Sequence, residues 1–168
     1  MKRAPMKTDL TVEYARKLFG YDPATGDLLH YARAHVAEGT KAGSVNKVGY
    51  VIVKVHQKSY VAHRIIWLIV TGQWPEAEID HINNNKADNR WINLRPATHS
   101  QNKANSNALR QGLKGAYKPK GMTKWRAIIR VSGRNKHLGY FDDEQDAHLA
   151  YLSAARAVFG EFANAGAA

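Results

Sequence analysis

The chain has 168 residues and no cysteine, which excludes a disulfide framework and cysteine-ligated zinc. Its 25 Lys and Arg against 14 Asp and Glu give a formal net charge of +11, a balance that favours a polyanionic partner such as nucleic acid. Residues 65–70 form the longest apolar run, far shorter than the ~20 residues that span a bilayer, and residues 1–8 lack the apolar core of a secretion signal, so we expect a cytoplasmic protein without a membrane partner.

The first sixty residues read as scaffold. Residues 11–19 fit a short helix, and the Asp-Pro-Ala-Thr-Gly sequence at 22–26 predicts a turn. Residues 51–61 alternate Val51, Val53 and Val55 with other side chains and break at 57–59, which predicts a β-hairpin. A nearly all-apolar helix over 62–71, closed by Gly72, should lie in the core.

The next segment predicts the order strand, loop, strand, helix. Residues 79–82 fit a short strand, 83–89 a polar connection, and 91–95 a returning strand that Pro96 is expected to stop. Thr98 and Gln101 have the spacing of a capping box, which predicts a helix over 99–107. The consecutive asparagines 83–85 are typical of a turn, and Asp88 and Arg90 read as loop charges.

The composition changes near residue 107. From Arg110 to Phe141 the chain carries nine basic residues and no acidic one. Within it, 125–131 alternates a packed face with a cationic face, so residues 114–141 predict a three-stranded antiparallel sheet. Four acids from Asp142 to Asp146 then open a helix whose packed side is expected to hold Ala147, Ala150, Tyr151, Ala154 and Val158. The frequent glycines argue against a continuous basic helix on a membrane.

Three residue types in the central segment suggest a phosphodiesterase centre. A carboxylate and an amide oxygen are hard donors, so Asp80 and Asn102, the latter in the first turn of the predicted helix, could hold Mg²⁺ together with substrate phosphate and water. A neutral His81 could take a proton from water. Neighbouring strand residues point in opposite directions, so Asp80 and His81 should have separate roles.

The stretch "YVAHRIIWLIVTGQWPEAEIDHINNNKADNRWINLRPATHSQNK" resembles the HNH endonuclease family with its ββα-metal (His-Me finger) fold, especially the phage and intron-encoded homing branch. The resemblance extends over residues 10–103. It implies that His81 is the general base, that Asp80 and Asn102 hold the divalent ion, and that Asn93 braces the loop so that His81 is aimed. Many relatives have histidine at the last position, and asparagine here favours Mg²⁺ or Mn²⁺ over zinc.

Two histidines keep alternative interpretations. His99 competes with Asn102 for the ligand role. By the resemblance His63 could contact the scissile phosphate, although a histidine satisfied at the edge of a core helix fits its position equally well.

The stretch "GAYKPKGMTKWRAIIRVSGRNKHLGYFDDEQDAHLAYLSAA" resembles the APETALA-type (ethylene-response-factor) DNA-binding domain, in which the sheet enters the major groove. The first strand here has fewer arginines than that family. The resemblance implies DNA contacts from Lys114, Tyr117, Lys118, Lys124, Arg126, Arg130, Arg134 and Lys136. Trp125 shares the strand face of Ala127 and Ile129 and is expected in the core.

The sequence thus predicts an α+β protein of two modules. Residues 1–107 would form a ββα-metal nuclease with its scaffold in 1–60, and 108–168 a three-stranded antiparallel sheet plus helix that binds duplex DNA. We expect a metal-dependent endonuclease of phage or mobile-element type, acting as a monomer or as a pair assembled on DNA. One active site cuts one strand per encounter, which predicts nicking. The alternatives are a non-catalytic DNA-binding regulator and, less favoured, an RNA-binding protein.

Overall fold

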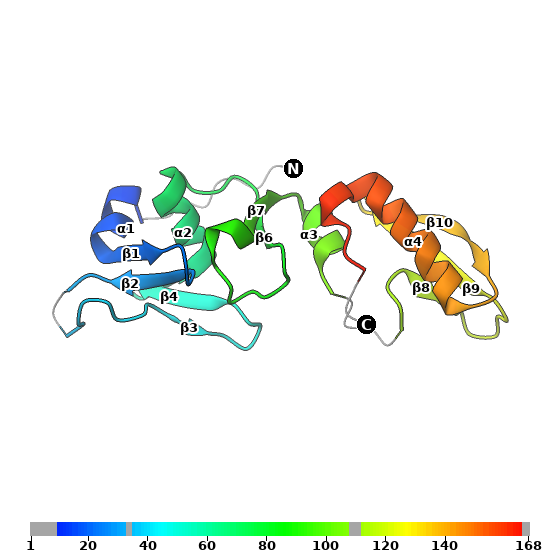
Figure 1. Ribbon diagram of the computed structural model, residues 1–168, viewed down its shortest axis with the longest axis horizontal. Coiled ribbons are helices and arrows are strands. Elements are labelled where there is room, and N and C mark those ends of the chain that lie inside the picture. The colour runs from blue at the N-terminus through cyan, green and yellow to red at the C-terminus, as the bar shows by residue number, and fades with distance from the viewer. Residues whose placement is uncertain (1–9, 33–34, 108–111, 166–168) are drawn as a thin grey trace. The chain divides into compact units, whose positions relative to one another are not determined.

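The computed structural model describes residues 10–32, 35–107 and 112–165. The chain divides into two compact units, Met1–Pro96 and Ala97–Ala168, which are treated separately below (Figure 1). The sequence predicted the boundary near residue 107, with the helix expected at 99–107 in the first module. In the structure that helix belongs to the second unit. The predicted linker at 108–111 and the segment 1–8 lie outside the described residues.

The first unit is a mixed α+β domain of short elements. Its helices are α1 (Val12–Leu18), α2 (Ala62–Thr71) and the 3-10 turn η1 (Trp91–Asn93). Its strands are β1 (Phe19–Asp22), β2 (Asp27–His30), β3 (Ser44–Val45), β4 (Val51–Val55), β5 (Lys58–Val61), β6 (Glu78–His81) and β7 (Leu94–Ala97). They form the antiparallel pair β1–β2, the antiparallel sheet β3–β4–β5 and the two-stranded sheet β6–β7.

One apolar core holds these small sheets together. The predicted hairpin β4–β5 and the predicted helix α2 are both confirmed, and α2 has the predicted bounds of 62–71. Gly72 closes α2 in the left-handed conformation, at φ 79°, which a glycine adopts without strain. Ile65 and Ile66 of α2 are fully buried with Val53 of β4, while Phe19 and Leu10 fill the same core from the N-terminal side.

Pro96 does not stop the returning strand, contrary to expectation. Strand β7 continues through it to Ala97. In a two-stranded sheet each strand has an unpaired edge, so a proline whose missing N–H faces that edge removes no ladder hydrogen bond. The chain therefore stays extended up to Thr98, the residue that caps the next helix.

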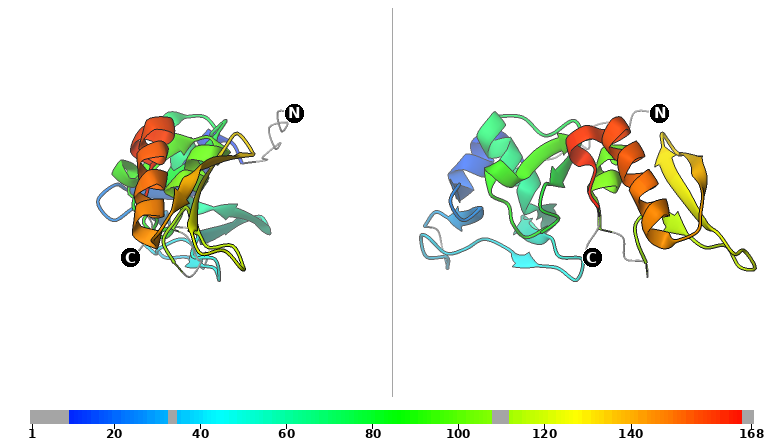
Figure 2. Two further views of the ribbon diagram at one scale, coloured as in Figure 1. Left: turned by 90° about the vertical axis from the view of Figure 1, so that its right-hand side faces the viewer. Right: turned by 45° about the vertical axis from the view of Figure 1, so that its right-hand side comes forward.

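The second unit contains α3 (His99–Asn105), β8 (Ala116–Tyr117), β9 (Trp125–Val131), β10 (Arg134–Phe141), α4 (Glu144–Phe159) and the 3-10 turn η2 (Gly160–Phe162). The predicted three-stranded antiparallel sheet is confirmed, in the order β10–β9–β8. Helix α4 packs on all three strands and covers one face of the sheet (Figure 2). Ala127 and Ile129 of β9 are buried on that covered face.

The buried side of α4 differs in part from the expected one. Ala147 and Tyr151 are buried as predicted, but the stripe continues through Ala155 and Phe159, and Val158 is 47% exposed. The i, i+4 spacing of these residues keeps them on one helix face, from which Val158 is turned away. None of the helices in the described parts of the chain is long and apolar enough to cross a membrane.

Candidate active site

Strand β6 places the Asp-His pair in the interior of the first unit. Ile79, Asp80 and His81 are 5%, 3% and 4% exposed, so both faces of this strand are covered. Because successive strand residues face opposite ways, the carboxylate and the imidazole enter different surroundings. This agrees with separate roles for the two side chains.

His81 lies in a cluster of rings and polar groups. Its Nε2 is 3.1 Å from Oδ1 of Asn89, a buried residue of the loop that follows β6. The ring meets the His63 ring edge-on, with centroids 4.9 Å apart, and Tyr50 lies 6.0 Å away. Burial lowers the pKa of His81, and the hydrogen bond to Asn89 opposes this in part. His81 is therefore a neutral imidazole at pH 7, as a general base requires.

His63 contributes a second buried imidazole from the first turn of α2. It is 6% exposed, and its Nδ1 has no hydrogen-bond partner among the described residues. Burial, and secondarily the nearby His81 and Arg64, lowers the pKa of His63 to about 3. The structure thus does not support the interpretation of His63 as a histidine whose hydrogen bonds are all made at the edge of the core. Its buried Nδ1 makes no hydrogen bond to the described residues and is available to a ligand.

Asp80 is paired with a cation that the sequence analysis did not single out. Arg95 of β7 donates from Nε to Oδ2 of Asp80 at 2.9 Å, and both side chains are buried. A carboxylate offers two oxygens and about four lone-pair positions, so this pairing is compatible with a further ligand. The pair fixes the Asp80 carboxylate while leaving it the donor chemistry that a hard divalent ion prefers.

Asn93 braces the loop between β6 and β7. Its Oδ1 accepts from the backbone N–H of Asn83 at 3.0 Å, and its Nδ2 donates to the backbone carbonyl of Asp88 at 2.7 Å. One buried amide therefore ties both ends of the connection together.

The asparagine run forms a turn, as predicted. Asn83 Oδ1 accepts from the N–H of Asn85, whose Oδ1 accepts from Ala87, and Asn84 has a positive φ of 61°. Asp88 and Arg90 are more than loop charges, because Arg90 donates through Nε and Nη2 to both carboxylate oxygens at 2.8 and 2.6 Å. That pairing lowers the pKa of Asp88 well below its usual range. The loop that carries Asn89 is thus rigid.

The two other candidate ligands lie on α3, in the second unit. The capping box is confirmed, with Thr98 accepting from Gln101 N–H and the Gln101 side chain accepting from Thr98 N–H at 2.8 Å. Asn102 lies at the end of the first turn and is half-buried, while His99 is exposed. Asp80 belongs to the first unit and Asn102 to the second, so their joint coordination of one ion stays a prediction.

A carboxylate and an amide oxygen are donors of the kind that a hard divalent ion prefers. Among the residues that the structure describes, no group of three or more His, Asp and Glu could hold a metal, and the chain has no cysteine. Mg²⁺ needs fewer protein ligands, since it keeps several waters and takes one or two carboxylates with substrate phosphate. Asp80 with an amide oxygen meets that requirement.

The strand register of the second unit shows on which face of the sheet several of the eight predicted DNA contacts lie. Arg126 and Arg130 alternate with the buried Ala127 and Ile129, so they lie on the face that α4 leaves open. Tyr117 of β8 pairs with Arg126 and shares this face, as does Tyr140 of β10, which pairs with Arg126 on the other side.

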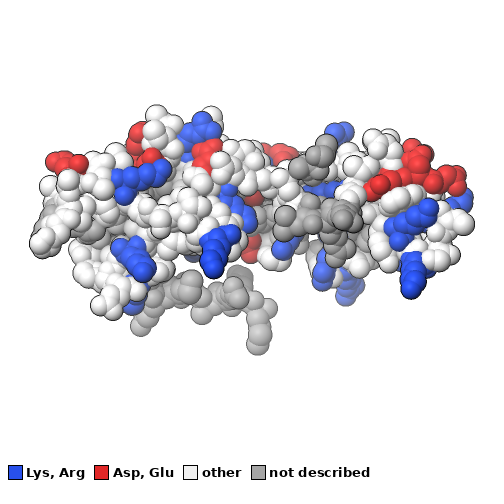
Figure 3. All heavy atoms as spheres, turned by 90° about the horizontal axis from the view of Figure 1, so that it is seen from below, with Lys and Arg blue, Asp and Glu red and all other residues white. Residues whose placement is uncertain are grey.

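The remaining predicted contacts lie elsewhere. Arg134 and Lys136 pair with Val131 and Ile129 and so have the parity of the α4 side, although both are exposed. Lys118 and Lys124 flank the strands, with the Lys118 ammonium 5.6 Å from the centroid of the Trp125 ring. Trp125 itself is half-buried. In Figure 3, Lys and Arg side chains are spread over the surfaces of both units.

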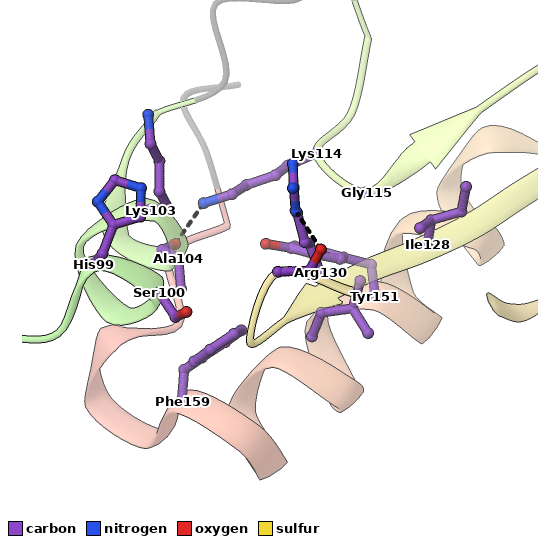
Figure 4. A pocket seen from close by; sticks show the side chains of 12 residues that line it. His99, Ser100, Lys103, Ala104, Lys114, Gly115, Ile128, Arg130, Tyr151 and Phe159 are labelled. Carbon is purple, nitrogen blue, oxygen red and sulfur yellow. Dashed lines mark hydrogen bonds between the residues drawn. The ribbon is translucent and has the colours of Figure 1, made fainter. Parts of the chain in front are cut away.

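Lys114 holds the second unit together instead of facing DNA. Its Nζ donates to the backbone carbonyls of Ala104, Ser106 and Asn164 at 2.5, 2.8 and 3.1 Å. An ammonium has three donors, so all are used, and the expected DNA contact at this residue is corrected. Burial lowers the pKa of Lys114 to about 8. The side chain lines a cavity of about 430 Å³ and points to the Ala104 carbonyl (Figure 4).

Sequence reasoning missed Asn89 and Arg95, although both lie inside the quoted stretch. The sequence signal for Asn89 was weak, because it follows three other asparagines of the same loop. Arg95 carried a stronger signal: a charged residue between apolar neighbours in a buried strand needs a partner of opposite charge.

Comparisons with known proteins match the central segment. A family model described as HNH endonuclease matches residues 60–104, 45 of the chain's 168 residues. An uncharacterized HNH endonuclease of Acanthamoeba polyphaga mimivirus is 34% identical over 103 residues, which make up 60% of this chain. The chain spans about half of that relative, 54%. No solved structure matches this chain. The segment 60–104, which contains Asp80, His81, Asn93 and Asn102, is therefore similar to HNH endonuclease domains.

Proposed function

We propose that this protein is a metal-dependent endonuclease that hydrolyses phosphodiester bonds of duplex DNA. The observation that carries the proposal is the setting of His81, a buried neutral imidazole with one ring nitrogen hydrogen-bonded and a second imidazole beside it. It stands next to a buried carboxylate in a segment that matches HNH endonucleases. His81 takes a proton from the attacking water, and Asn93 keeps the loop in place.

Asp80 and Asn102 would hold the divalent ion, with Mg²⁺ favoured and Mn²⁺ possible by their oxygen donors. A bound ion would stabilise negative charge on the phosphate and on the leaving 3′ oxygen. His63 would donate a hydrogen bond to a phosphate oxygen through its buried Nδ1, in the tautomer that carries the proton there. His99 is the alternative to Asn102, and comparing the Mg²⁺ requirement of Asn102→Ala with that of His99→Ala separates them.

The sheet of the second unit would bind DNA through its open face, in the manner of the APETALA-type domain. Support comes from Arg126, Arg130, Tyr117 and Tyr140, which combine positive charge with aromatic rings on one uncovered surface. Arg134, Lys136, Lys118 and Lys124 would contact the phosphate backbone from the margins. The family match ends at residue 104, so this role rests on the sheet itself.

A nicking assay tests the enzymatic proposal. Supercoiled plasmid incubated with the full chain and Mg²⁺ should be converted to the open circle, and EDTA should prevent this. His81→Ala should bind DNA and fail to nick. The matched control is His56→Asn, which changes an exposed histidine on the β4–β5 turn and should nick normally. Normal nicking by His81→Ala would refute the assignment of the base.

The biological use would be that of a site-preferring nicking or homing enzyme of a phage or mobile element, in the cytoplasm of its host. One active site per chain should cut one strand, so linear plasmid should appear only after nicked circles accumulate. The alternative is a non-catalytic DNA-binding regulator. EDTA-insensitive DNA binding without nicking at any protein concentration would favour that alternative.

A further inference from the structure

Asn89 is the hydrogen-bond partner of the proposed base. This residue is 2% exposed, and its Oδ1 lies 3.1 Å from Nε2 of His81. The other end of the same amide donates from Nδ2 to the carbonyl of Ala87 at 3.4 Å. A carbonyl cannot donate, so this second contact identifies the end of the amide that faces His81 as the oxygen.

The partner determines which nitrogen of the ring carries the proton. An amide oxygen only accepts hydrogen bonds, so the contact requires an N–H at Nε2 of His81. In a neutral imidazole the lone pair then resides on Nδ1. When Nδ1 takes the proton from water, the O–H bond breaks and the new N–H bond forms. The water oxygen then bonds to phosphorus, and the bond between phosphorus and the leaving 3′ oxygen breaks. The Nε2–H to Asn89 contact persists throughout, and the proton later leaves Nδ1 for solvent or the leaving oxygen.

Asn89 is in turn held by the β1–β2 hairpin. The hydroxyl of Tyr21 donates to the backbone carbonyl of Asn89 at 3.1 Å. At the tip of the hairpin, Gly26 has a φ of 82° and lies so close that a Cβ atom there would be 2.4 Å from Arg90 N and 2.6 Å from Asn89 C. Any side chain at position 26 would push the Asn89 backbone away.

The hairpin tip is itself fixed by its own side chains. Asp22 accepts from the N–H of Ala24 through Oδ1 and from the hydroxyl of Thr25 through Oδ2, at 2.9 and 2.8 Å. Its backbone carbonyl accepts from Gly26 at 2.8 Å. The Asp-Pro-Ala-Thr-Gly turn is therefore a rigid support that precedes the segment matched by the HNH family model.

We propose that Asn89 is a positioning residue that holds His81 as its Nε2–H tautomer, and that the β1–β2 hairpin holds Asn89 through Tyr21 and Gly26. The inference deepens the proposed function and rests on it for the role of His81 as base. The tautomer of His81, the structural part of the proposal, can be measured without any activity assay.

Nuclear magnetic resonance of the full chain, with ¹⁵N-labelled histidine, tests the tautomer directly. The His81 signals are identified by their loss in His81→Gln. The wild type should show Nε2 protonated and Nδ1 unprotonated. Asn89→Leu, which has similar volume and no acceptor, should shift His81 toward a mixture of tautomers, while Asn89→Asp should keep the wild-type pattern. An unchanged His81 pattern in Asn89→Leu would overturn the proposal.

Nicking kinetics test the consequence. Asn89→Leu should lose about 10²-fold in kcat with KM within about twofold, because general-base catalysis contributes roughly 10²–10⁴-fold. Asn89→Asp, which retains the acceptor, should recover most of that loss. A KM effect alone, or equal losses in the Leu and Asp variants, would contradict a positioning role.

A milder variant keeps the test valid should Asn89→Leu fail to fold. Tyr21→Phe removes only the hydroxyl that holds the Asn89 carbonyl, and should lower kcat several-fold with a partial tautomer shift. Tyr60→Phe is its control, since Tyr60 is a half-buried tyrosine of the same unit that stacks on Trp74. Equal behaviour of the two variants would refute the role of the hairpin. A wild type with the Nε2–H tautomer and no nicking would refute the proposed function alone.

Discussion

Asp80 and Arg95 form a buried ion pair in the first unit. Their side chains are 4% and 11% exposed, with Nε and Oδ2 2.9 Å apart. Removing one partner of such a pair leaves the other charge in a poorly solvated site. The pair thus fixes the position of a carboxylate in the protein interior.

We therefore expect Arg95→Met to lower the free energy of unfolding by about 3–5 kcal/mol in EDTA. Mg²⁺ should restore part of the loss, since a ligand that binds the folded state stabilises it by mass action. Urea denaturation with EDTA and with Mg²⁺ measures both effects. Lys41→Met is the control, because the Lys41 side chain is largely exposed in its pair with Asp27 and should contribute at most about 1 kcal/mol. A comparable loss in both variants would contradict the argument.

His63 should make the stability of the first unit depend on pH. Its pKa is about 3 in the folded chain against 6.5 for an ordinary histidine, so between these values the unfolded chain binds more protons. Stability is then full above pH 6.5 and falls as the pH drops, by about 1.4 kcal/mol per pH unit. Between pH 7 and pH 5 the wild type should lose about 2 kcal/mol more than His63→Gln in urea denaturation. Parallel losses would exclude His63 as the cause.

At the scale of elements, side-chain periodicity predicted the helices and strands that are long enough to show a repeating pattern. The β4–β5 hairpin, helix α2, the capping box of α3 and the alternation of β9 follow from side-chain patterns over seven or more residues or from a specific cap. Strands β1, β2 and β3 were missed, because two to four residues do not establish an alternation. Their positions depend on tertiary contacts, such as Gly26 against Asn89.

In the candidate site too, the sequence predicted the residues of a local pattern and missed those that depend on tertiary contacts. Asp80, His81 and Asn93 were predicted within the segment and are buried there. The partners that set their chemistry, Arg95 and Asn89, depend on how the loop folds back. That path is fixed by hydrogen bonds between residues eight to fifteen positions apart, which the residue pattern does not show.

The open face of the β8–β10 sheet leads to a binding prediction. Arg126→Gln and Arg130→Gln should each weaken binding to duplex DNA and reduce the slope of log affinity against log salt by about 1, since each removes one phosphate-neutralising charge. Fluorescence anisotropy over a series of salt concentrations measures this. Arg156→Gln, on the exposed side of α4, should leave the slope unchanged.

Two outcomes would contradict this assignment. Equal effects of the α4 control and the sheet variants would mean that net charge alone, and not the open face, determines binding. Stronger competition by RNA than by duplex DNA at the same salt would favour the RNA-binding alternative.

At the scale of the molecule, the family match and the packing place helix α3 differently. The match continues from the first unit into α3, whereas the side chains of α3 pack in the second unit. The HNH family match includes this helix up to Ala104, yet the buried Ala104 packs in the core of the second unit with Tyr151 and Phe159. The Lys114 ammonium binds the carbonyls of Ala104 and Ser106. A compositional change near residue 107 marks where the basic stretch begins, but the core of the second unit begins ten residues earlier, at Ala97.

This difference can be measured with two fragments. Residues 97–168 should fold alone, whereas 108–168 lacks two of the three acceptors of Lys114 and exposes the surface that Ala97 and Ala104 cover. A buried donor left without its acceptor costs about 1–3 kcal/mol, and in a domain this small each 1 kcal/mol lowers Tm by roughly 4–8 °C. We expect 108–168 to melt at least about 10 °C lower, or not to fold, as followed by circular dichroism. Restoring 97–107 should recover the transition, and equal melting of both fragments would place the boundary at 107 after all.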